Sequence, residues 1–155
     1  MQIKYFKELM MNNLYPIFLI VHLFCAIIFL GYIFCDVVLL SPIRKILGDE
    51  FADKMFNIIG RRSKGMPLVF VLLIVTGLAM LSRYVGGEMG YFATTLQQFL
   101  MIKTLLAFGI ALMIAISLGF YYGLKKPSPL RKVIHPIALV LGILIVILAK
   151  LAFYF

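Results

Sequence analysis

Long apolar runs dominate the chain, and most polar residues lie in the segments between them. The four longest runs are residues 14–40, 67–81, 99–122 and 134–155. A helix that crosses a bilayer needs about 20 mostly apolar residues, and the second run reaches this length if it continues to residue 84. Arg83 would then extend its charged group to the interface. The sequence therefore predicts spanning helices at about 14–40, 67–84, 99–122 and 134–155.

The same pattern excludes other architectures. Apolar and polar residues do not alternate with a period of two, as they do in barrel strands. In lipid, every backbone polar group must be satisfied internally, which leaves a helical bundle. The first run is also too long for the apolar part of a cleavable signal peptide. We expect one all-α transmembrane domain over residues 1–155, an integral membrane four-helix bundle in the lipid bilayer.

Two segments outside the apolar runs carry a helical pattern of their own. Within residues 41–66, apolar side chains recur at helical spacing at positions 51, 55, 58 and 59. This predicts a short amphipathic helix in the first inner loop, lying on the membrane surface. Residues 1–13 read as an amphipathic lead-in at the interface, followed by Pro16 in the first turn of the first spanning helix.

Charge gives the expected orientation. The net charge is +9, and ten of the fifteen basic residues fall within residues 41–66 and 123–133. Cytoplasmic loops of membrane proteins are enriched in Lys and Arg, so these loops are predicted to face the cytoplasm. The chain is then a multi-pass protein of the inner (cytoplasmic) membrane with both termini outside. The basic residues need no nucleic acid partner to explain them.

One face of the first helix gathers its polar groups. Steps of three and four residues place seven side chains on a single face. They are Tyr15, Phe18, His22, Cys25, Phe29, Tyr32 and Asp36. A polar face in lipid must point into the bundle, so this face is expected to meet the other helices.

His22 and Lys103 are the candidate site residues. His22 lies about 12 Å below the outer end of its helix, and Lys103 about 6 Å inside the outer boundary of the third helix. Two readings of His22 stay open, a neutral imidazole hydrogen-bonded to a neighbouring helix or a ligand of haem or a metal. Lys103 either extends to the headgroups or faces a shared outer cavity. In such a cavity it could hold an anion such as a porphyrin propionate, or it could ligate iron.

Asp36 and His135 lie at the other boundary, about 20 Å deeper than His22. Asp36 is expected to pair with a basic side chain there, from Arg61, Arg62 or Lys45. His135 begins the fourth helix at the level of Asp36. Because one haem has both axial ligands at one depth, His22 and His135 are not expected to hold the same haem.

Three stretches resemble a known superfamily. They are "HLFCAIIFLG", "VTGLAML" and "FLMIKTLLA", which carry His22 in the first helix and Lys103 at the start of the third. The chain resembles the superfamily that joins the copper-resistance protein D type (CopD-like) to the membrane protoporphyrinogen oxidase type (HemJ-like). The resemblance implies four helices, haem b, and His22 and Lys103 as the functional pair. The chain has no Trp, which favours a CopD-like haem-binding relative over the oxidase.

Three functions follow as hypotheses. The first is a haem-b redox protein with His22 as iron ligand, exchanging electrons with quinone or a porphyrin-like substrate. The second is copper binding or transport, since Cu(I) favours thiolate, thioether and imidazole; the donors would be His22, Cys25, Met80 and Met101. The third is a non-catalytic subunit of a membrane complex, and a homo-oligomer is also compatible with the sequence.

Overall fold

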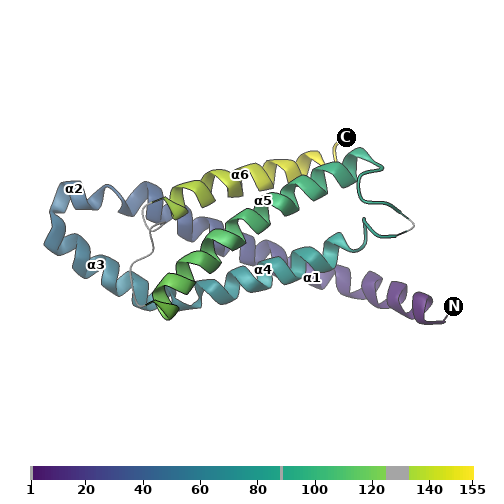
Figure 1. The fold of residues 1–155 in the computed structure, drawn as a ribbon, viewed down its shortest axis with the longest axis horizontal. Coiled ribbons are helices and arrows are strands. Elements are labelled where there is room, and N and C mark those ends of the chain that lie inside the picture. The colour runs from purple at the N-terminus through teal and green to yellow at the C-terminus, as the bar shows by residue number, and fades with distance from the viewer. Residues whose placement is uncertain (1, 88, 125–132) are drawn as a thin grey trace.

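The computed structural model of the chain describes residues 2–87, 89–124 and 133–155. Most of the predicted inner connection 123–133 lies outside the described residues. No strand occurs among the residues that are described, and the helices follow one another along the chain (Figure 1). The α-helices are α1 (Gln2–Phe34), α2 (Ile43–Leu47), α3 (Asp49–Arg62), α4 (Met66–Leu81), α5 (Thr95–Leu118) and α6 (Ile134–Leu151). π-Helical turns continue α1 over Cys35–Leu40 and α5 over Gly119–Gly123.

Four stretches are long and apolar enough to cross a membrane. They are Asn13–Leu47, Ser63–Leu81, Thr95–Leu118 and Ile134–Leu151. The all-α architecture and the four apolar helices predicted from the sequence are therefore confirmed. The short helix predicted in the first loop is α3, and α2 and α3 together project beyond one end of the bundle (Figure 1).

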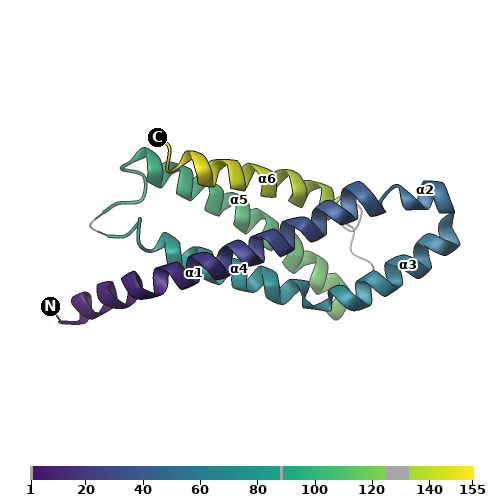
Figure 2. The same ribbon diagram turned by 180° about the vertical axis from the view of Figure 1, so that it is seen from behind.

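The beginning of the chain differs from the prediction. Residues 2–13 do not form a separate lead-in, because α1 runs without interruption from Gln2 to Phe34 and extends past the other helices (Figures 1 and 2). Pro16 consequently lies inside α1 and not in its first turn. A proline ring is compatible with a helix interior when the surroundings satisfy the carbonyl that loses its donor.

Both chain termini lie at one end of the bundle, which we call the termini end, and α2 and α3 lie at the opposite hairpin end (Figures 1 and 2). α1 packs along α4 and also contacts α6, and α5 packs along α6. Over the described residues, α4 and α5 have little close backbone contact. The bundle is thus closed around α1 and α6 and looser between α4 and α5.

The face of α1 that was predicted to point inward does so. All seven of its side chains are buried or half-buried, whereas most other positions of the apolar part of α1 are exposed. Phe29 and Ile33 join the central core with Phe70 of α4, and the Phe29 and Phe70 rings lie 4.9 Å apart between centroids. α6 approaches α1 closely at Gly142, where a Cβ atom would lie 2.6 Å from Cδ1 of Leu30.

Aromatic contacts join the helices at the termini end. The hydroxyl groups of Tyr15 and Tyr84 lie 3.1 Å apart, and the Arg83 guanidinium sits 4.8 Å from the centre of the Tyr15 ring. Tyr84 also meets Phe153 edge to face, with 5.7 Å between ring centroids. α1, α4 and the C-terminal end of the chain are therefore tied together at this end.

Candidate functional site

His22 is held by α4. Its Nδ1 atom lies 3.0 Å from the carbonyl oxygen of Leu73 and 3.1 Å from Oγ1 of Thr76. The hydroxyl of Thr76 donates a hydrogen bond to the carbonyl of Leu72 at 2.7 Å. Gly77 leaves room for the imidazole, since a Cβ atom there would lie 3.0 Å from Cε1 of His22.

These contacts define the tautomer of His22. A carbonyl oxygen can only accept, and the Thr76 hydroxyl has already given its proton to Leu72. Nδ1 must therefore carry a hydrogen and donate it. In the neutral imidazole the lone pair then resides on Nε2, for which no hydrogen-bond partner is found in the described part of the chain. A histidine whose Nδ1–H is fixed on a backbone carbonyl is the usual form of a metal-ligating histidine.

Lys103 is half-buried on α5, eight residues after the helix begins at Thr95. Over the described residues, α1 and α5, which carry the two candidate site residues, have little close backbone contact. Thr76, the partner of His22 on α4, is buried to 5% exposure. That His22 and Lys103 share one site therefore stays a prediction from the sequence.

The donors considered for copper are arranged differently. Cys25 and Met80 are both buried, but they flank His22 along the bundle axis. α1 and α4 run antiparallel. Cys25 therefore lies one turn from His22 toward the hairpin end, whereas Met80 lies one turn past Thr76 toward the termini end. Cys25 and Met80 are thus two turns apart, which is about 11 Å along the bundle axis. No group of three His, Cys, Asp or Glu side chains suited to a metal ion occurs among the described residues.

A second polar pair lies at the hairpin end. Nδ1 of His135 and Oδ2 of Asp36 are 2.5 Å apart, and Tyr32 meets the His135 ring edge to face with 6.0 Å between centroids. The sequence predicts a common level for Asp36 and His135, but it indicates Arg61, Arg62 or Lys45 as the partner of Asp36 and does not indicate the pair with His135 that the structure shows. Asp36 lies in the π-helical turn that continues α1, fourteen residues after His22, which is about 21 Å of helix. The two histidines thus belong to separate sites.

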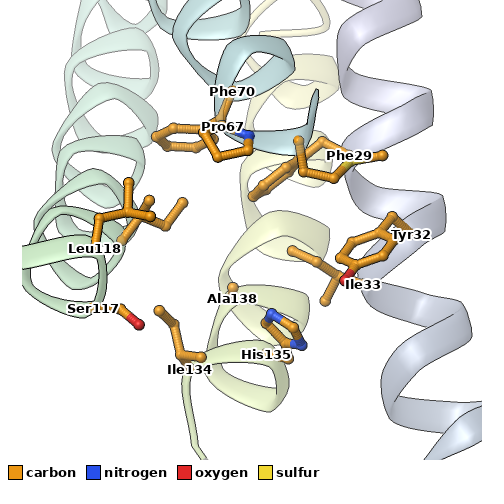
Figure 3. A pocket seen from close by; sticks show the side chains of 12 residues that line it. Phe29, Tyr32, Ile33, Pro67, Phe70, Ser117, Leu118, Ile134, His135 and Ala138 are labelled. Atoms are coloured by element: carbon orange, nitrogen blue, oxygen red, sulfur yellow. The ribbon is translucent and has the colours of Figure 1, made fainter. Parts of the chain in front are cut away.

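A cavity of about 190 Å³ lies beside this pair. All four long helices line it: α1 with Phe29 and Tyr32, α4 with Phe70, α5 with Ser117, and α6 with His135 and Ala138 (Figure 3). Nothing in the sequence pattern indicated the cavity, because it depends on how far α4 and α5 stand apart.

Together these features define a helical bundle in which four helices are long and apolar enough to span a membrane. Two polar sites lie between its helices, one at His22 and one at the His135–Asp36 pair. Comparison with known protein families, with curated proteins and with solved structures finds no match to this chain.

Proposed function

We propose that the protein is an integral membrane protein that binds haem b through His22 and serves a redox role. The observation that supports this most is the hydrogen bonding of His22. Its Nδ1–H is fixed by Leu73 and Thr76, so that the basic Nε2 is free to bind iron. The donor set fits haem better than copper, because an iron porphyrin needs one or two protein ligands whereas Cys25 and Met80 do not converge on His22.

Each residue has a distinct role in this proposal. His22 would hold the haem iron, and Thr76 and Leu73 hold its ring in one orientation. Lys103 would pair with a propionate, for which a half-buried cation is suited. When bound, haem supplies one-electron transfer, and its potential depends on axial ligation, hydrogen bonding and burial. A quinone or a porphyrin-like compound would be the electron partner.

An absorption spectrum tests the proposal directly. The full chain is expressed with haem supplementation, purified in detergent, and measured in oxidised and reduced form. We expect a Soret band that shifts on reduction, with haem and protein in a fixed ratio. Purified, folded protein without a Soret band would refute the proposal and leave His22 as an interior histidine hydrogen-bonded to α4.

The orientation in the membrane is a further part of the proposal. Residues 41–66, which include α2 and α3, carry six of the basic residues, so we expect the hairpin end in the cytoplasm. A reporter that is active only in the cytoplasm should be inactive when fused after Phe155. The same reporter should be active when inserted at Gly48, between α2 and α3. The reverse result would invert the orientation.

A further inference from the structure

We propose that the cavity at the hairpin end binds the ring of a lipid-soluble quinone and that His135 is its hydrogen-bonding partner. The inference concerns a site separate from His22 and does not require haem to be bound there.

The size of the cavity fits one substituted ring. Its volume is about 190 Å³. An apolar protein cavity of about 150 Å³ is large enough to bind benzene, so a six-membered ring with small substituents fits here. Pockets for larger ligands usually measure about 300–1,000 Å³. The cavity is therefore too small for a porphyrin, and the two ligands are assigned to different sites.

The walls select a molecule that dissolves in the membrane. Phe29 and Phe70 provide aromatic surface, and Ala138 is 2% exposed. Figure 3 shows these side chains around an open centre with His135 at its edge. The cavity lies between Phe70 of α4 and Ser117 of α5, the two helices that have little close backbone contact. A flat apolar ring entering from the lipid would pass between these helices.

The polar groups distinguish a quinone from an acyl chain. With Asp36 ionised, Nδ1 of His135 donates to its carboxylate, and Nε2 is left for a ligand. Neutral His135 accepts a hydrogen bond from a hydroxyl at Nε2, whereas the protonated ring donates one to a carbonyl. A quinone and its quinol present these two groups at the same positions. The Ser117 hydroxyl borders the same space and both donates and accepts.

Binding of two matched probes tests the inference. Decyl-1,4-benzoquinone and decylbenzene share a flat six-membered carbon ring and a decyl tail, and the quinone has two carbonyl groups where decylbenzene has aromatic C–H groups. Each is titrated by calorimetry into the purified full chain in micelles. We expect wild-type protein to bind the quinone at least about tenfold more tightly, which is the contribution of one or two buried hydrogen bonds. Equal affinities would overturn the proposal, because the cavity would then take any apolar chain.

Three variants locate the site. His135→Phe should remove the preference for the quinone while keeping an aromatic side chain. Ala138→Leu should fill the cavity and weaken both probes by about tenfold or more. Ala115→Leu places the same side chain at an exposed position of α5 and should change neither affinity. His135→Phe and Ala138→Leu change different properties of the cavity, so one of them is a sufficient test if the other does not fold. Unchanged quinone affinity in folded His135→Phe or in folded Ala138→Leu overturns the proposal.

The outcome is independent of the haem proposal. Quinone binding that persists in His22→Ala would support this site even if no Soret band is found. A Soret band without selective quinone binding would support the proposed function and refute this inference.

Discussion

Replacing His22 with alanine is expected to abolish haem retention. The variant loses the iron–nitrogen bond, and no other histidine lies at that depth, since His135 is about 20 Å away along the bundle. Haem per protein, measured by the pyridine haemochrome assay, should fall to the background level. Cys25→Ser is the matched control, because Cys25 is buried one turn away on the same face and should be dispensable for haem.

The neighbours of His22 should have graded effects. Gly77→Leu should displace the imidazole, because even a Cβ atom would lie 3.0 Å from Cε1, and haem should be lost although the ligand is present. Lys103→Ala should retain some haem with weaker binding or a shifted potential, since an ionic contact contributes less than the axial bond. His135→Ala should leave the haem spectrum nearly intact. Loss of haem in His135→Ala but not in His22→Ala would contradict the assignment.

Much of the fold is predictable because long apolar helices follow simple rules. Length and apolarity identify the four helices that are long and apolar enough to span a membrane, and the 3.6-residue period puts His22, Phe29 and Asp36 on one face. Both features are properties of a single helix and need no knowledge of its neighbours. The inward orientation of that face then follows from the cost of exposing polar groups to lipid.

Contacts between helices were less accessible to sequence reasoning. Asp36 and His135 lie 99 residues apart, and their pairing depends on the rotation of α6 against α1. Thr76 and Gly77 support His22 only because of the register of α4, and neither stands out in an apolar run. Common depth was the one available signal, and it placed Asp36 and His135 at one level without defining their contact.

Gln97→Ala should be the most destabilising single change at the termini end. The Gln97 side chain is 4% exposed and makes four hydrogen bonds. Oε1 accepts from the backbone N–H groups of Ala93 and Thr94, and completes a capping box with Thr94 at the start of α5. Nε2 donates to the carbonyl groups of Tyr84 and Met89, at 2.9 and 3.0 Å. One side chain therefore fixes both ends of the loop that joins α4 to α5.

Alanine at this position would leave four part-buried backbone groups of the loop without their side-chain partner, and we expect a loss of about 2–4 kcal/mol in the free energy of unfolding. Denaturation followed by circular dichroism in micelles measures it, and faster trypsin cleavage after Arg83 would show that the loop has opened. Gln98→Ala is the control, because the side chain of Gln98 is exposed and donates one hydrogen bond, to the carbonyl of Phe92. Equal stability of the two variants would contradict this role.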